Sequence, residues 1–167
     1  MPFELPPNSQ AQALISVQSG LQTVFSAPQT VTVATVQPSI FTTASSGKGQ
    51  GVIFNYPANQ LVNSSAPAKA GEVVVVYCTG LGLTNPSPPA SGFATPAGQY
   101  DVVNKVTATV GGINAPVQFA GLVPSLVGLY QVNVQIPPGV AANNTATLQL
   151  TQNGVTSNMV TLAITDR

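Results

Sequence analysis

Residues 72–79 of the chain read EVVVVYCT, and this stretch decides the fold class. Val, Tyr and Thr are β-branched or aromatic residues, which favour extended strands. Residues 73–76 are apolar at every position, a pattern typical of a strand that is buried on both faces. The stretch is therefore predicted to be the central strand of a sheet, with Val74, Val76 and Cys78 on one buried face.

Further strands are predicted on both sides of this stretch. The 15 Gly and 15 Pro residues divide the chain into short runs, and these runs are rich in the strand-forming residues Val, Ile, Thr, Tyr and Phe. No segment shows sustained helical periodicity. Hairpin turns are predicted at residues 110–115 and 152–155, and the Pro-, Gly- and Ser-rich residues 84–100 are predicted to form a long loop. The predicted strands cover residues 11–18, 30–35, 50–55, 72–79, 105–110, 116–120, 129–136, 145–151 and 159–164.

The strand pattern predicts an all-β fold, an immunoglobulin-like antiparallel β-sandwich of about seven strands with an N-terminal two-stranded extension. A weak internal repeat supports a division of the chain. Residues 5–7 (LPP) match 136–138 (IPP), and residues 26–33 match 157–164 at the same spacing. A repeat of this length fits a whole domain. Residues 1–35 are thus predicted to be the last strands of a preceding, incomplete sandwich, and residues 36–167 a complete domain.

The two N-terminal strands have an apolar face and no evident partner. An isolated two-stranded ribbon is marginal in water, and its edges offer unpaired backbone groups to other chains. The unpaired backbone groups of the ribbon could be covered by joining the sheet of its own sandwich or by pairing with a neighbouring copy in trans, and disorder of the segment is the third alternative. The candidate self-association residues are Ala11, Ala13, Ile15, Val17, Val31 and Val33.

The chain is almost uncharged, with four Lys or Arg and four Asp or Glu residues, 5% of the total, against about 25% in an ordinary domain. Two explanations are open: a secreted β-protein with Thr and Gln on its outer faces, or a subunit that buries its surface in an assembly. With a net charge of zero, repulsion does little to oppose association. Four scattered cations argue against nucleic acid as a partner. The longest apolar run, residues 73–78, is too short for a membrane-spanning helix of about 20 residues, so no membrane insertion is expected.

The residue types exclude most catalytic sites, and we expect a protein that is not an enzyme and has no cofactor. Without histidine, neither a Ser-His-Asp nor a Cys-His site can form. The chain lacks the Cys and His ligands of a zinc site, and Asp101 alone does not supply the clustered acidic ligands that a calcium site usually needs. No metal is therefore expected. Cys78 is predicted to be a buried, unreactive thiol. Gly80-Leu81-Gly82 is predicted to be a tight bend after the central strand, not a phosphate loop, because no helix follows it.

Exposed aromatic side chains are the remaining candidates for ligand contact. The chain has no Trp, and of its four Tyr residues Tyr77 and Tyr130 fall in strands and are predicted to lie in the core. Tyr56 and Tyr100 lie in or beside loops, so they are the possible contact residues for a glycan or protein at the loop of residues 84–100.

Short Gly-, Pro- and aromatic-containing motifs are spread over most of the chain. The motifs are residues 37–41 (QPSIF), 49–51 (GQG), 67–72 (PAKAGE), 76–82 (VYCTGLG), 111–112 (GG), 120–124 (AGLVP), 128–134 (GLYQVNV), 136–137 (IP) and 153–158 (NGVTSN). Together they resemble the Solibacter-type C-terminal domain family, uncharacterised modules at the ends of large secreted acidobacterial proteins. The resemblance covers residues 36–164, and residues 1–33 are similar to the end of the same family's upstream half. Cys78 departs from the small residue expected there.

The resemblance implies an extracellular or cell-surface protein with no assigned catalytic residues. The first residues contain no signal peptide, so a signal is expected upstream or to have been removed. The expected function is that of a non-catalytic structural, spacer or adhesion module, with other domains of the same protein or other copies as partners. The alternatives are a self-assembling filament subunit that pairs its N-terminal strands in trans, and a glycan- or protein-binding module that uses residues 84–100.

Overall fold

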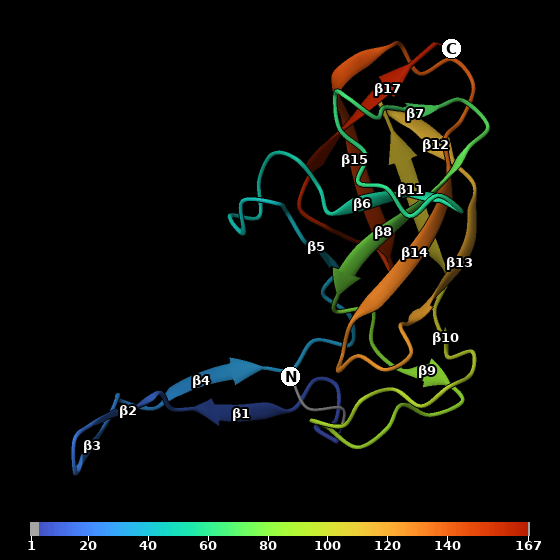
Figure 1. Ribbon diagram of the computed structural model, residues 1–167. Coiled ribbons are helices and arrows are strands. Elements are labelled where there is room, and N and C mark those ends of the chain that lie inside the picture. The colour runs from blue at the N-terminus through green and yellow to red at the C-terminus, as the bar shows by residue number, and fades with distance from the viewer. Residues whose placement is uncertain (1–3, 167) are drawn as a thin grey trace.

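The structure is a computed structural model that describes residues 4–166, and it is an all-β sandwich from which a narrow N-terminal ribbon protrudes (Figure 1). No helix occurs within residues 4–166. The all-β fold class predicted from the sequence is confirmed. The sandwich consists of two sheets, named here after their longest central strands, the β8 sheet and the β15 sheet.

The β8 sheet has the order β5-β8-β14-β13-β10-β9, with β6 beside β8. Its strands are β5 (Ser39–Ile40), β6 (Ile53–Tyr56), β8 (Val73–Thr79), β9 (Thr84–Asn85), β10 (Asp101–Val102), β13 (Val117–Leu122) and β14 (Tyr130–Gln135). The β15 sheet has the order β12-β11-β15-β17-β7, with β16 beside β15. Its strands are β7 (Ala68–Lys69), β11 (Val106–Val110), β12 (Ile113–Ala115), β15 (Asn143–Gln152), β16 (Val155–Thr156) and β17 (Val160–Thr165).

Strand β8 occupies the central place that the sequence predicted. It pairs with β14 on one side and with β5 and β6 on the other. Val74, Val76 and Cys78 are fully buried between the two sheets, as predicted. Val75, on the opposite face, is also buried, and the ring of Phe54 meets that of Tyr77 on this face at a centroid distance of 5.7 Å. The unbroken apolar run is thereby explained, because both faces of β8 are covered.

The core between the sheets is made by the alternating residues of the long strands. In β14, Tyr130, Val132 and Val134 point inward and are buried, while the residues between them are partly exposed. Strand β15 alternates in the same way, with Leu148 and Leu150 buried. Aliphatic side chains from the two inner faces thus pack as in other β-sandwiches.

The structure differs from the predicted strand list mainly in its short strands. Both predicted hairpin turns are present, at Gly111-Gly112 and Asn153-Gly154. The sandwich nevertheless has more than the seven strands expected, because two- and three-residue strands complete its edges. Strand β9 lies inside the region predicted to be only loop, and β7 pairs with β17 in parallel, so the sandwich is not wholly antiparallel.

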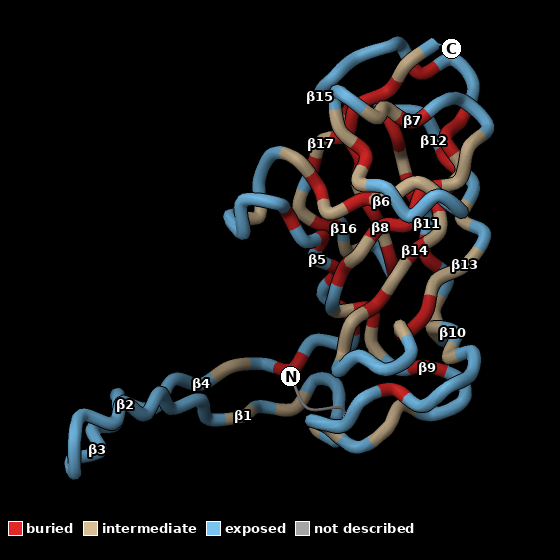
Figure 2. Tube along the Cα trace, in the orientation of Figure 1, coloured by how far each residue is buried: buried red, intermediate tan, exposed pale blue. Residues whose placement is uncertain are grey.

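The N-terminal ribbon, called the arm and defined as residues 10–32, contains β1 (Gln10–Ala13), β2 (Ser16–Ser19), β3 (Gln22–Phe25) and β4 (Gln29–Thr32). Strand β1 pairs with β4 and β2 pairs with β3, and none of the four joins either sheet of the sandwich. The ribbon therefore does not add to its own sheet within the described residues. Figure 2 shows it extending away from the sandwich and exposed along almost its entire length.

Two details of the arm correct the sequence prediction. The single strand predicted over residues 11–18 is divided into β1 and β2, and β3 was missed. The two-residue turn Gly20-Leu21 makes the chain fold back much earlier than expected. Val33, predicted to lie on the apolar face of the ribbon, is instead buried at the junction with the sandwich, where its N–H donates to the Ser9 carbonyl at 2.9 Å.

Candidate functional site

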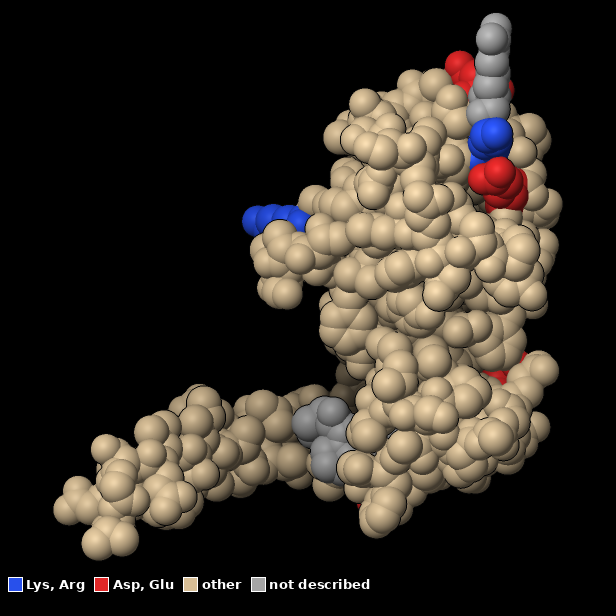
Figure 3. All heavy atoms as spheres, in the orientation of Figure 1, with Lys and Arg blue, Asp and Glu red and all other residues tan. Residues whose placement is uncertain are grey.

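The arm carries the first of two apolar surfaces that form the candidate functional site. Leu21 at the turn is fully exposed, and Phe25 is 63% exposed. No charged residue lies between Glu4 and Lys48, so the whole arm is uncharged, and Figure 3 shows no charged atoms along it from this side. The exposed large apolar side chains of the arm are Leu14, Ile15, Val17, Leu21, Val24 and Phe25.

The predicted self-association residues fall partly on this surface. Ile15 and Val17 are exposed, and so is Ala13. Ala11 and Val31 face each other across β1 and β4 and are half-buried, and Val33 is buried. Sequence reasoning missed Leu21, Val24 and Phe25, although Gly20 between two stretches of alternating residues is a hairpin signal that could have found them.

A groove where the arm meets the sandwich is the second apolar surface, called the base groove. Its volume is about 790 Å³. One wall is the stem of the arm, residues 5–7 and 32–37, and the other comes from the loops that follow β8, β9, β10 and β13. Four of its apolar side chains are exposed to solvent: Leu83, Phe93, Val103 and Val127. None of the described residues that line the groove is charged.

Buried hydrogen bonds fix the floor of the base groove. The Tyr130 hydroxyl donates to the Gly82 carbonyl, and the pKa of this phenol is raised by its burial and by the nearby Cys78. The Nε2 of Gln152, which is 1% exposed, donates to the carbonyls of Leu81 at 3.2 Å and Asn104 at 2.9 Å. The chain segments under the groove are therefore held in place from the core, so the floor of the groove is preformed.

A carboxylate clamp joins the two walls of the groove. Glu4, at the start of the stem, accepts hydrogen bonds from the Ser91 N–H at 2.8 Å and the Ser91 hydroxyl at 2.6 Å. These bonds favour the ionised carboxylate and lower the pKa of Glu4 below its ordinary value. Ser91 belongs to the loop that also carries Phe93, so the clamp fixes the position of that loop against the stem.

A second groove, called the side groove, lies along the open side of the sandwich between β11 and β13. Its volume is about 700 Å³. Within the described chain, β13 has a strand neighbour on this side only at Gly121, which pairs with Asp101. The side groove is lined by Asp101 and Lys105 among other residues, so it contains charges that the base groove lacks.

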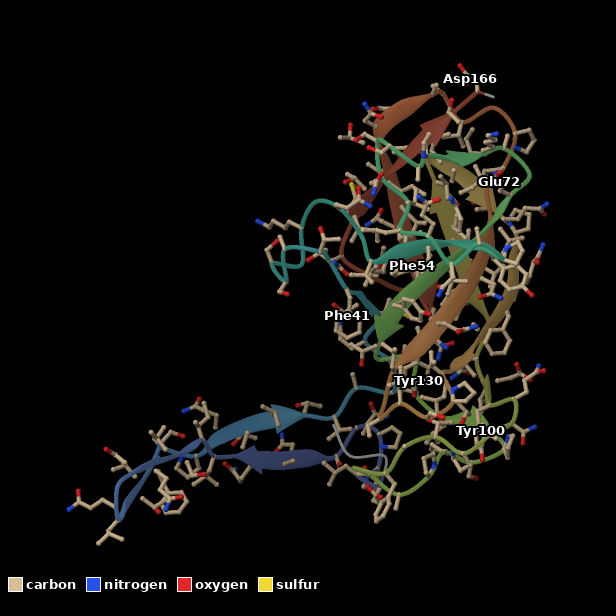
Figure 4. The ribbon with its side chains drawn as sticks, viewed as in Figure 1. Phe41, Phe54, Glu72, Tyr100, Tyr130 and Asp166 are labelled. Atoms are coloured by element: carbon tan, nitrogen blue, oxygen red, sulfur yellow. The ribbon has the colours of Figure 1, made fainter. Side chains whose placement is uncertain are left out.

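The two tyrosines proposed for ligand contact do not come together. Tyr56 ends β6 at one edge of the β8 sheet and is exposed. Tyr100 directly precedes β10, which lies beyond β13 and next to the edge strand β9, and it is half-buried against the core with its carbonyl bonded to the Leu122 N–H. Strands β8, β14 and β13 lie between them. Tyr56 and Tyr100 therefore do not form a joint aromatic platform, because strands of the sheet separate them. Figure 4 shows Tyr100 beside the loops at the end of the sandwich where the arm begins.

Cys78 is expected to be inert towards thiol reagents in the native protein. Burial raises the pKa of its thiol to about 12, so the reactive thiolate is nearly absent at neutral pH. Treatment with a maleimide at pH 7 should leave the folded protein unlabelled, and labelling should become rapid when urea unfolds it. Fast labelling of the native protein would contradict the burial of β8.

The described residues offer little for other kinds of site. Residues 4–166 contain no group of three or more metal-ligating side chains. The structure also shows no helix long and apolar enough to cross a membrane in this part of the chain. The candidate site therefore consists of the arm and the base groove, two uncharged apolar surfaces. Comparison with protein families, with curated proteins and with solved structures gives no match for this chain.

Proposed function

We propose that this chain is a non-catalytic structural subunit of an extracellular or cell-surface assembly, and that copies join through the arm. The observation that carries the proposal is the arm itself, an uncharged ribbon with six large apolar side chains in water. The same sequence resemblance that suggests the location also supports an immunoglobulin-like arrangement of the sandwich strands.

The free energy gained by burying the apolar side chains of the arm favours its binding to a partner. Burying a Val, Leu or Phe side chain stabilises a protein by about 1.5–3 kcal/mol. Exposed apolar patches of this kind mark interaction surfaces in soluble proteins. Association costs about 4–15 kcal/mol in lost freedom of motion, so several arm side chains must be buried together for stable contact. The arm offers enough of them in one ribbon.

A spacer or adhesion module within a longer chain is the second candidate function. In that case an upstream segment of the same protein would complete the sheet that β1–β4 begin. The low charge and the exposed ribbon fit this arrangement too. Glycan binding is less supported, because strands β8, β14 and β13 lie between Tyr56 and Tyr100.

Charged substitutions in the arm test the proposed function. In the double variant Val24→Asp/Phe25→Asp, full-length protein is expected to be monomeric at concentrations where the unsubstituted protein forms larger species, because docking would now bury two charges. Light scattering after size-exclusion chromatography measures the masses. The melting temperature of the sandwich should not change, since neither side chain packs on it.

The matched control is Met159→Asp, which places a charge at an apolar side chain that is 53% exposed and lies outside both the arm and the base groove. This variant should assemble like the unsubstituted protein. An unsubstituted chain that stays strictly monomeric at high concentration would rule out assembly through the arm.

A further inference from the structure

We propose that the base groove of one copy is the receptor for the arm tip of the next copy, so that subunits join head to tail. The arm tip is defined as residues 17–25. The proposal rests on the proposed self-assembly and names the surface that receives the arm.

The shape of the arm tip favours a groove over a flat surface. Val17 and Val24 are paired residues of β2 and β3, so they share one face of the ribbon. Phe25 pairs with Ser16 and lies on the other face. Because apolar side chains project from both faces and Leu21 from the end, only a partner that surrounds the tip can cover them all. The base groove has two walls and an apolar lining.

The charges of the lining residues favour the base groove over the side groove as the receptor for the arm. The arm has no charged residue, and neither have the described residues that line the base groove. Docking there covers no charged residue of this described lining, and the adjacent Glu4 carboxylate already accepts two hydrogen bonds from Ser91. In the side groove, an uncharged arm would cover Asp101 and Lys105 without offering either one an ionic partner. Such burial of a charge is costly, so the arm tip fits the base groove better.

An arm tip that fills the groove must come from a second copy. The stem of each arm forms one wall of its own base groove. The paired strands β1 and β4 extend away from the sandwich and carry β2 and β3 at their far end, as Figure 1 shows. Because the stem that forms this wall continues directly into β1 and β4, the tip cannot fold back into its own groove without breaking the β1–β4 pairing. The groove is therefore free for the arm of another molecule.

Docking in this way would build an open chain of subunits. Donor tip and receptor groove are different surfaces, so the contact is heterologous, and each added copy presents a new free arm and a new free groove. Unless the rotation between copies closes a ring, the product is a filament. Its contacts would be uncharged, and its stability should therefore depend weakly on salt.

The test uses two full-length variants that each lose one half of the contact. Phe93→Asp/Val127→Asp disables the groove and keeps the arm, while Val24→Asp/Phe25→Asp disables the arm and keeps the groove. All four side chains are more than half exposed, so both variants should fold. Each alone is expected to be monomeric in light scattering. An equimolar mixture should form a one-to-one dimer of doubled mass that does not grow further.

Milder variants, Phe93→Ser/Val127→Ser and Val24→Ser/Phe25→Ser, replace the charged ones if either fails to fold, with the same expected masses. A groove variant that assembles like the unsubstituted protein, beside a monomeric arm variant, would overturn the base groove as receptor but leave the proposed function standing. A mixture that stays monomeric would also overturn it. A monomeric unsubstituted protein whose arm binds phosphatidylcholine vesicles would overturn both proposals.

Discussion

Replacing Val76 with Asp is expected to abolish folding of the sandwich. Val76 is 0% exposed in the middle of β8, where it is paired with Ile53 on one side and Val132 on the other. No cation lies in the core cluster around it to pair with a carboxylate. An unpaired buried charge costs several kcal/mol, which is comparable to the whole stability of a typical domain, about 5–15 kcal/mol.

Circular dichroism and urea titration would measure the effect. The variant should lack a cooperative unfolding transition at 25 °C. Thr79→Asp is the matched control, because Thr79 is the exposed last residue of the same strand. The control should change the free energy of unfolding by less than about 0.5 kcal/mol, as is usual for surface substitutions. A soluble, cooperatively folding Val76→Asp protein would contradict the central position of β8.

The long strands could be predicted because their pattern is local. Strand β14 alternates buried and partly exposed residues along six consecutive positions, and β8 is apolar throughout its middle. The Gly111-Gly112 and Asn153-Gly154 turns also follow from adjacent residues, since only a few residue types suit a two-residue hairpin turn. These features depend on neighbours in the sequence, so the sequence alone was sufficient to predict them.

The short edge strands could not be predicted in the same way. Strand β7 consists of two residues, and it is a strand only because Ala68 and Lys69 lie beside Ile164 and Thr165, far along the chain. Strand β10 likewise depends on β9 and on Gly121. Two residues contain no periodicity, so long-range pairing decides their conformation.

Of the two surfaces of the candidate site, the arm could be predicted from the sequence and the base groove could not. The apolar face of the N-terminal ribbon was visible in the sequence through Ile15 and Val17, although β3 was missed. The base groove was not visible, because its walls come from the stem and from Phe93, Val103 and Val127, which no sequence pattern connects. Only the fold brings these residues to one end of the sandwich.

Substituting Gly80 with Ala is expected to destabilise the protein by about 3–5 kcal/mol. Gly80 has φ +80°, where an alanine costs roughly 1–2 kcal/mol. A Cβ at Gly80 would also lie 1.9 Å from the carbonyl oxygen of Gln37. Residue 37 would have to move, which strains the packing by about 1–3 kcal/mol and weakens the hydrogen bond from the Gln37 N–H to the Gly80 carbonyl, 2.8 Å long.

Gly112→Ala is the matched control for this close approach. Gly112 has φ +79°, but a Cβ there would have no atom within 4 Å, so only the backbone cost of roughly 1–2 kcal/mol applies. Urea unfolding of both variants measures the two losses. Equal losses in the free energy of unfolding would mean that the segment around Gln37 moves away from the new Cβ without destabilising the protein. A larger loss at Gly80 would show that the end of β8 rigidly fixes this segment, from which the arm projects and which forms a wall of the base groove.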